Sequence, residues 1–249
     1  MAVPVVKMEN ISKHFGGVEA LQSVDFVLNQ SEIVGLVGDN GAGKSTLIKI
    51  LSGVYQADSG TIYIDDQKVE IEDPHTAIQL GIQTIYQDLA LVDQLSVVRN
   101  MFLGKEFRRQ GLGGVFGLFN TREMENKTSD ILDRLGVRAD YGFLKQKVQK
   151  LSGGQRQAIA IGKTMITPPK ILILDEPTAS ISVKERPHIL TLVKRLKTQG
   201  ISSIFISHNL EEVFQVADRV VILSRGRVVG DKIVAETSNQ EVVKLIVQF

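Results

Sequence analysis

Hydrophobic and polar residues alternate with the period of a β-strand near both ends of the chain. Residues 5–11 (VVKMENI) and 24–29 (VDFVLN) alternate in this way, and two glycines at 16–17 mark the turn region between them. Residues 61–71 predict a hairpin that turns at 65–67, and residues 219–230 predict a second hairpin. These segments therefore favour an antiparallel β-region close to the N-terminus and a further hairpin near the C-terminus.

Short apolar runs alternate with segments of helical period between those hairpins. The runs have the length of buried strands and cover residues 31–38, 82–87, 170–175 and 202–208. Apolar residues recur at helical spacing in three segments that follow strands, at residues 44–53, 184–200 and 210–218. Strands that alternate with helices predict an α/β fold with a largely parallel sheet and helices on both faces.

The middle of the chain has a different character. Helical periodicity dominates from about residue 89 to 165, as in residues 122–137, and a glycine-rich stretch at 111–120 interrupts it. We interpret that stretch as a surface loop with partly buried aromatics, which either connects elements or contacts a partner. We predict one domain over residues 1–249, with a core at about 1–88 and 166–249 and an inserted helical subdomain at about 89–165.

Composition narrows the function classes. The chain has 249 residues, 43% of them hydrophobic, which is enough for a sizeable core. A net charge of +1, from 29 basic and 28 acidic residues, argues against bulk electrostatic binding to nucleic acid or to an anionic membrane surface. No cysteine is present, so thiol chemistry is excluded. We find no signal sequence and no apolar stretch of spanning length, so we predict a cytoplasmic chain whose membrane role comes through a partner.

Residues 38–46 (GDNGAGKST) fit the phosphate-binding pattern G-x-x-x-x-G-K-[ST] between a predicted strand and a predicted helix. Glycines let the backbone approach phosphate oxygens, and the start of the helix adds its positive dipole end. Lys44 supplies a charge for the β- and γ-phosphates, and the Ser45 hydroxyl can bind Mg²⁺. The predicted ATP-binding residues here are Gly38, Asp39, Asn40, Gly41, Ala42, Gly43, Lys44, Ser45 and Thr46.

Polar side chains end three of the predicted strands, where ligands bind in open α/β sheets. Asp175 ends residues 170–175 and suits the shell of a magnesium ion, and Glu176 follows it as a general base for water. Gln87 ends residues 82–87 and is placed to contact either the metal or the attacking water. His208 ends residues 202–208 and is placed to hydrogen-bond the γ-phosphate.

A second glycine-rich helix start lies more than a hundred residues downstream of the first. Residues 151–155 read LSGGQ, in which Ser152 is a natural N-cap and Gly153, Gly154 and Gln155 open the next helix. This start lies in the helical subdomain, so one molecule would not easily fold it onto its own phosphate loop. A two-fold dimer, in which each LSGGQ closes over the other subunit's nucleotide, solves this geometry.

The motifs GDNGAGKS, YQD, LSGGQRQ, ILILDEPTAS and SH follow one another in this order. On these motifs the sequence resembles the ATP-binding subunits of ABC transporters from about residue 4 to 230. The resemblance implies a RecA-like P-loop NTPase core, an antiparallel β-region, a helical subdomain, ATP and Mg²⁺, and a head-to-tail dimer. It also implies that Phe15 stacks on adenine, for which the alternative is a phenylalanine of the core. Within the family, the chain is most similar to importers of the ribose, xylose and fructose type.

The resemblance implies an ATPase that drives a monosaccharide importer from the cytoplasmic face of the membrane. Its implied partners are transmembrane permease subunits, a second ATPase subunit and, indirectly, a substrate-binding protein, with no nucleic acid. Many such importers fuse two ATPase halves, so this single half either pairs with a second chain or is a fragment of a longer protein. An exporter subunit and a soluble ABC ATPase remain as alternatives.

One position departs from the family pattern. After EPTAS the family usually reads Leu-Asp, whereas this chain has Ile181 and Ser182. A serine keeps a hydrogen-bonding group and loses the charge. The hypothesis is that coupling between the two ATP sites is weaker or rewired, and unchanged cooperativity of hydrolysis in Ser182→Asp would contradict it.

Overall fold

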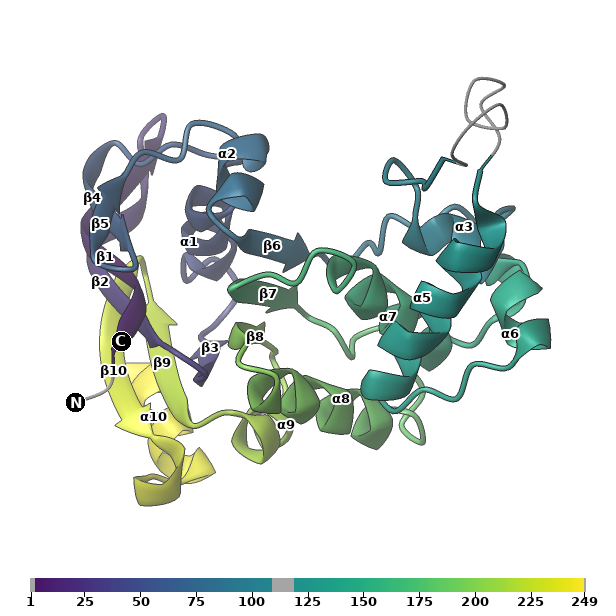
Figure 1. Cartoon of the computed structure of the whole chain (residues 1–249). Helices are drawn as coiled ribbons and strands as arrows, with labels where there is room; N and C mark the ends of the chain where they lie inside the picture. Colours follow the sequence, from purple (N-terminus) through teal and green to yellow (C-terminus); the bar gives the residue numbers. More distant parts are fainter. Residues whose placement is uncertain (1–2, 109–118, 249) are drawn as a thin grey trace. The chain divides into compact units, whose positions relative to one another are not determined.

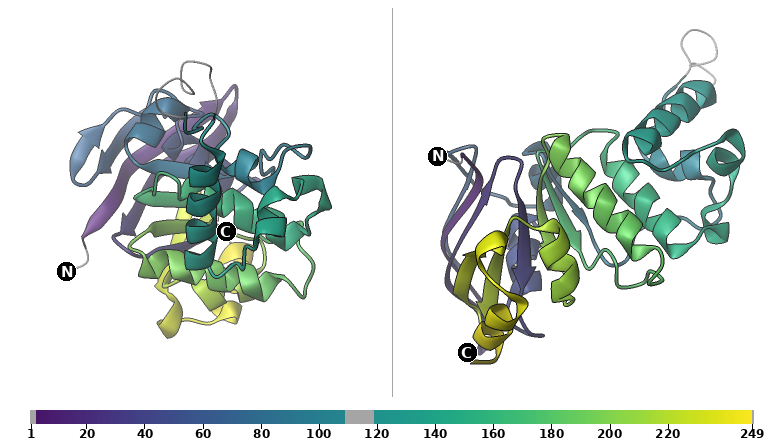
Figure 2. Two further views of the ribbon diagram at one scale, coloured as in Figure 1. Left: turned by 45° about the vertical axis from the view of Figure 1, so that its right-hand side comes forward. Right: turned by 90° about the horizontal axis from the view of Figure 1, so that it is seen from below.

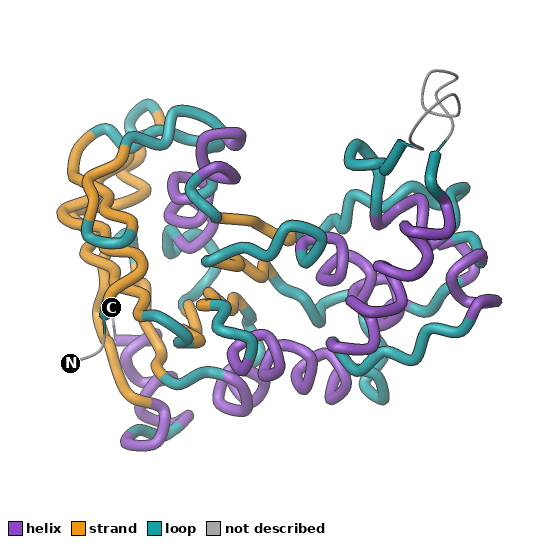
Figure 3. Tube along the Cα trace, viewed as in Figure 1, coloured by secondary structure: helices purple, strands orange, loops and turns teal. Residues whose placement is uncertain are grey.

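A computed structural model describes residues 3–108 and 119–248 of the chain. Most of the predicted loop at 111–120 therefore lies outside the described residues. Figures 1 to 3 show the described elements in sequence order and by type. Among the described residues, no helix combines the length and the apolar character that crossing a bilayer requires.

The chain divides into two compact units. The core unit comprises Met1–Gln87, Pro169–Ala179 and Val193–Phe249, and the helical unit comprises Asp88–Pro168 and Ser180–Leu192. The sequence had assigned Ser180–Leu192 to the core. These residues group with the helical unit because their backbone and side chains contact the start of α7 (Gly153–Thr164), as described below.

An antiparallel sheet forms the N-terminal part of the core unit, and its strand order is β2-β1-β4-β5. The β1–β2 pair is long because the period-2 pattern of the sequence continues beyond both predicted segments. The four strands are β1 Pro4–Phe15, β2 Val18–Asn29, β4 Ser59–Ile64 and β5 Gln67–Val69. The predicted N-terminal strands and hairpin are therefore confirmed.

A six-stranded sheet forms the rest of the core unit, with strand order β10-β9-β3-β8-β7-β6. All neighbours pair in parallel except the antiparallel hairpin of β9 and β10. The strands are β3 Ile33–Val37, β6 Ile82–Ile85, β7 Ile171–Asp175, β8 Ser202–Ile206, β9 Arg219–Ser224 and β10 Arg227–Ile233. The predicted α/β class with a mainly parallel sheet is confirmed.

Strand β3 shows how helices cover both faces of this sheet. Val34 and Leu36 belong to the hydrophobic core that also holds the buried face of α1 (Lys44–Leu51). Gly35 points to the other face, where an added Cβ would lie 2.3 Å from Val213 Cγ1 of α9 (Leu210–Val216). Alternation along one strand therefore holds α1 on one face and α9 on the other.

Other helices of the core unit lie at its margins. α2 (Pro74–Gln79) begins at an Asp73 N-cap and contacts β6. The C-terminal helix α10 (Asn239–Gln248) packs against β9 and β10, which Figure 2 shows in yellow. The predicted helix at 184–200 is α8 (Arg186–Thr198), and the division between the two units falls within it.

Helices and loops build the described part of the helical unit (Figure 3). Their apolar faces pack on one another, with Gly162 of α7 giving room to Leu132 and Met101. The helices are α3 Val97–Met101, α5 Thr121–Arg134, α6 Tyr141–Lys145 and α7 Gly153–Thr164. The helix predicted at 122–137 corresponds to α5, which ends three residues earlier.

Candidate functional site

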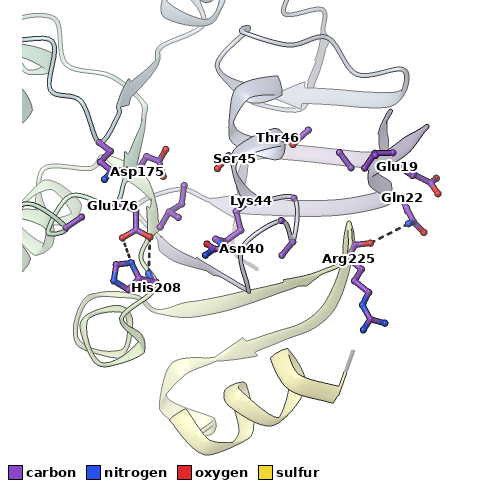
Figure 4. Close-up of a pocket in the computed structure, with 18 residues that line it drawn as sticks. Glu19, Gln22, Asn40, Lys44, Ser45, Thr46, Asp175, Glu176, His208 and Arg225 are labelled. Atoms are coloured by element: carbon purple, nitrogen blue, oxygen red, sulfur yellow. Dashed lines mark hydrogen bonds and ion pairs between the residues drawn. The ribbon is translucent and has the colours of Figure 1, made fainter. Parts of the chain in front are cut away.

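A cavity of about 1000 Å³ lies in the core unit, at the carboxyl ends of β3, β6, β7 and β8 (Figure 4). Ligands bind at this end of open α/β sheets. The lining residues come from β2 and from five other places in the sequence, at residues 40–46, 87, 175–179, 206–208 and 225. They are Val18, Glu19, Ala20, Gln22, Asn40, Gly41, Ala42, Gly43, Lys44, Ser45, Thr46, Gln87, Asp175, Glu176, Ala179, Ile206, His208 and Arg225.

The loop after β3 requires glycine at defined positions. Gly38 has φ of 147°, and an added Cβ would lie 2.1 Å from the Leu223 carbonyl oxygen. Gly43, the N-cap of α1, has φ of 106°, and an added Cβ would lie 2.8 Å from the Ala20 carbonyl oxygen. No side chain caps α1, so the first N–H groups of α1 face the cavity as a site for an anion.

Lys44 is the cation of this loop. Its Nζ donates hydrogen bonds to the carbonyl oxygens of Gly38 (2.5 Å) and Asp39 (2.9 Å). Burial lowers the pKa of Lys44, and the charges of Glu176, Asp39 and Asp175 oppose that shift. An ammonium group held between loop carbonyls at the cavity wall is placed for a phosphate group.

Asp175 stands at the end of β7, in the cavity wall. Burial raises the pKa of Asp175, and the neighbouring charge of Glu176 raises it further, while Lys49 and Lys44 act in the opposite direction. A half-buried carboxylate beside a second carboxylate is stabilised by a bound cation. This electrostatic setting fits a divalent metal ion.

Glu176 and His208 form a hydrogen-bonded pair in the cavity (Figure 4). Glu176 Oε2 lies 2.8 Å from His208 Nδ1, and Glu176 Oε1 accepts the backbone N–H of His208 at 3.1 Å. The backbone of Glu176 adopts φ of 50°, in the left-handed region that non-glycine residues rarely occupy. Such strain concentrates at functional sites, where the surrounding structure enforces it.

A buried carboxylate, which the sequence analysis missed, holds the two segments that carry Glu176 and His208. Glu212 of α9 is 4% exposed, and its Oε2 accepts hydrogen bonds from the hydroxyls of Thr178 and Ser207. Thr178 follows Glu176 by two residues, and Ser207 precedes His208. Glu212 lies on the buried face of α9 with Val213 and Val216, and an acidic residue on such a face was the available signal.

The remaining predicted residues of the core unit lie in different surroundings. Gln87 lines the cavity, although β6 ends two residues earlier, at Ile85. Gly38 and Asp39 form the base of the loop and are not among the lining residues. Phe15 is not among them either. Its side chain is 42% exposed, and its ring meets that of Tyr55 edge-on, with centroids 5.1 Å apart.

The LSGGQ segment belongs to the helical unit and begins α7. Ser152 and Gln155 form a capping box, in which Gln155 N–H donates to Ser152 Oγ at 3.3 Å and Ser152 N–H donates to Gln155 Oε1 at 3.0 Å. An added Cβ on Gly153 would lie 2.9 Å from the Ser180 carbonyl oxygen. Ser152 Oγ also donates to Glu185, a residue that the sequence analysis did not single out.

The cavity fits a nucleoside triphosphate with a hard divalent cation. Its loop presents backbone N–H groups and one ammonium group, and Ser45, Gln87 and Asp175 add oxygen donors to its lining. Oxygen donors of this kind suit Mg²⁺. The fold and the cavity together define a P-loop nucleotide-binding protein.

Comparison with known proteins narrows this class. A family model described as "ABC transporter" matches residues 21–179. The chain is 43% identical, over 98% of its length, to ribose import ATP-binding protein RbsA 1 of Rubrobacter xylanophilus. It is 39% identical, over 98% of its length, to xylose/arabinose import ATP-binding protein XylG of Sulfolobus acidocaldarius. The chain therefore belongs to the ABC transporter family, as an ATP-binding domain.

Solved structures agree with this assignment. An ATP-binding cassette of an ABC transporter in its ADP conformation superposes with a TM-score of 0.83, at 27% identity, and the match covers 99% of each chain. A dimeric cassette bound to ADP and Pi superposes with a TM-score of 0.74, at 25% identity, over 92% of this chain and 98% of the other.

The relatives differ in length from this chain. The match covers 94% of the Sulfolobus protein but only 47% of the Rubrobacter protein. Two Escherichia coli relatives, named galactofuranose transporter ATP-binding protein YtfR, are likewise covered over 47% of their length. The chain thus spans about half the length of several curated relatives that it matches.

Proposed function

We propose that this chain is the ATP-hydrolysing motor subunit of an ABC importer for a monosaccharide. One observation carries the proposal: a single cavity holds the phosphate loop with Lys44 on one side and the Glu176–His208 pair on the other. Relatives named as ribose and xylose/arabinose import proteins support a sugar as the transported substrate.

The chemistry follows from the placement of these groups. Loop N–H groups and Lys44 bind the phosphates, and the Glu176 carboxylate accepts a proton from the attacking water. The water oxygen bonds to the γ-phosphorus as the bond to the β-phosphate oxygen breaks, and that electron pair leaves with ADP. His208 orients the γ-phosphate. Nδ1 of His208 lies 2.8 Å from Glu176 Oε2, and this contact fixes the orientation of the imidazole ring.

A magnesium ion would be held by Ser45, Asp175 and Gln87, directly or through water. When bound, it would neutralise negative charge on the phosphate groups. Asp175 fits this role because its burial and the adjacent Glu176 make an unpartnered carboxylate costly there.

Two copies, or two homologous chains, complete the sites in this proposal. Ser152, Gly153, Gly154 and Gln155 of one subunit contact the nucleotide bound to the other, and the dimeric cassette among the solved structures supports such an arrangement. Closure and reopening drive permease subunits in the membrane, to which a substrate-binding protein delivers the sugar. The chain then works at the cytoplasmic face.

The proposal is tested by measuring the rate at which the Glu176→Gln variant releases phosphate from ATP. Loss of a general base lowers turnover by about 10²–10⁴-fold, while ATP binding stays near normal. Glu72→Gln, which makes the same charge change on an exposed residue of the core unit, serves as the control. Near-normal hydrolysis by Glu176→Gln would show that Glu176 is not the general base.

Direction and substrate need a second assay. The chain is reconstituted in vesicles with its permease and substrate-binding protein, and labelled ribose or xylose is placed outside. ATP-dependent accumulation inside supports import. Transport only in the opposite direction would make the chain an exporter subunit.

A further inference from the structure

We call residues 151–155 (LSGGQ) the signature. Its Ser152 is already hydrogen-bonded within its own chain. Ser152 Oγ donates to Glu185 Oε1, and Ser182 Oγ donates to Glu185 Oε2 at 2.9 Å. All three residues belong to the helical unit. One carboxylate therefore joins the start of α7 to the serine that replaces the usual aspartate of the family.

Proton count makes this contact restrictive. A serine hydroxyl has one proton to donate. Ser152 Oγ accepts the N–H of Gln155 and gives its single proton to Glu185. It can donate to a phosphate oxygen only after the bond to Glu185 has broken.

Charge adds to the restriction. Besides the Ser152 and Ser182 hydroxyls, the backbone N–H of Gly154 also lowers the pKa of Glu185. An added Cβ on Gly154 would lie 3.1 Å from Glu185 Oε1. The carboxylate thus occupies the position at the N-terminus of α7 that favours an anion. Hydrogen bonds from Ser152 and Ser182 lower the pKa of Glu185, so it is ionised at neutral pH.

Ser182 holds the carboxylate in this position. Its hydroxyl binds the oxygen that Ser152 does not use. An aspartate at position 182 could not donate this hydrogen bond, and its charge would repel Glu185. The departure from the family pattern and the self-bound signature are therefore parts of one arrangement.

We propose that Glu185 is an internal competitor of the γ-phosphate, which occupies the start of α7 and must leave before the signature can close over the partner's nucleotide. The inference rests on the proposed function, because it concerns the same composite site. It makes Glu185 a regulatory residue and Ser182 the latch that retains it.

ATP-driven dimerisation of the full chain tests this idea. Light scattering over a series of protein concentrations, with saturating ATP and Mg²⁺, gives the dimer dissociation constant of Glu176→Gln, which binds ATP without turnover. The same measurement follows for Glu176→Gln combined with Glu185→Gln. If about one signature in ten is open at equilibrium, removing the competitor tightens dimerisation by about tenfold for each composite site.

Two further variants sharpen the result. Glu123→Gln is the control, because Glu123, like Glu185, belongs to the helical unit and accepts a hydrogen bond from a side chain three residues before it, that of Asn120. Glu185→Ala removes the side chain altogether and should tighten the dimer as well. ATP affinity of the monomer should not change. A gain of dimerisation is not an effect that structural damage produces.

The possible outcomes distinguish failure of this inference from failure of the proposed function. Tighter dimerisation with Glu185→Gln and Glu185→Ala, but not with Glu123→Gln, supports the competitor. Unchanged or weaker dimerisation in both Glu185 variants, with the Glu176→Gln parent still dimerising, overturns it and leaves the proposed function intact. Failure of every variant to dimerise, with ATP bound, refutes the homodimeric composite site and the inference together.

Discussion

The phosphate loop offers a prediction in which steric and conformational costs can be separated. Gly41→Ala places a methyl group at φ of 80° with no atom within 4 Å. Left-handed backbone costs an L residue about 1–2 kcal/mol, and the smaller freedom of alanine in the unfolded chain offsets about 0.4–1 kcal/mol. The net loss is about 1 kcal/mol. Gly38→Ala carries a similar conformational cost and also drives a Cβ to 2.1 Å from the Leu223 carbonyl oxygen.

That contact involves backbone on both sides, so no side chain can turn away from it. Overpacking of this kind costs about 1–3 kcal/mol. Gly38→Ala should therefore lose about 2–4 kcal/mol, a large share of the roughly 5–15 kcal/mol that stabilises a typical domain.

Urea unfolding followed by far-UV circular dichroism measures both variants, and fluorescent ATP analogues report binding. Gly41→Ala should lose only about 1 kcal/mol of stability and should lose nucleotide affinity, because Gly41 lines the cavity. Gly38→Ala should lose stability first. Equal unfolding midpoints for the two variants would refute the steric reasoning.

Three further predictions concern charge and stacking. Because the pKa of Asp175 is raised, stability falls as pH rises above its ordinary value of 3.8, so Asp175→Asn should exceed wild type in urea midpoint at pH 7, and the gap should shrink in acid. Hydrogen bonds from Lys13 and His14 lower the pKa of Asp58 to about 2, so its stabilisation is complete above pH 3.8 and is lost as pH falls toward 2. Asp58→Asn should therefore lower the midpoint at pH 7 and match wild type near pH 2; a pH-independent difference would contradict this. Phe15→Ala should weaken ATP binding by about tenfold or more if the ring stacks on adenine, and unchanged affinity by calorimetry would reject stacking.

Much of the core unit could be predicted from local patterns. The phosphate loop occupies one continuous segment, so spacing alone identifies it. Apolar runs located β3, β6, β7 and β8, and alternation located the β9–β10 hairpin. Short helices escaped prediction because five or six residues give too little periodicity. α2, α3 and α6 nevertheless begin at capping residues, Asp73, Ser96 and Asp140, whose side chains accept backbone N–H groups.

The site was harder to predict from the sequence where it depends on contacts between residues distant along the chain. Ser152 and Glu185 are separated by 33 positions, and Thr178 and Glu212 by 34. No spacing rule links such pairs, because only tertiary folding brings them together. The sequence likewise did not show that Gly38 meets the backbone of β9, a contact that makes glycine obligatory there.

Shared anchoring by Glu212 has a consequence for local unfolding. The segments after β7 and β8 both hydrogen-bond to this buried carboxylate, so neither can detach without exposing it. Fluctuations should therefore open residues 176–179 and 207–212 together, as one cooperative unit rather than as two independently fraying loops. Amide hydrogen exchange would then report a common opening free energy for both segments. The two groups that act on the γ-phosphate would be lost and regained as a pair, so the chain would not populate a state in which only one of them is in place.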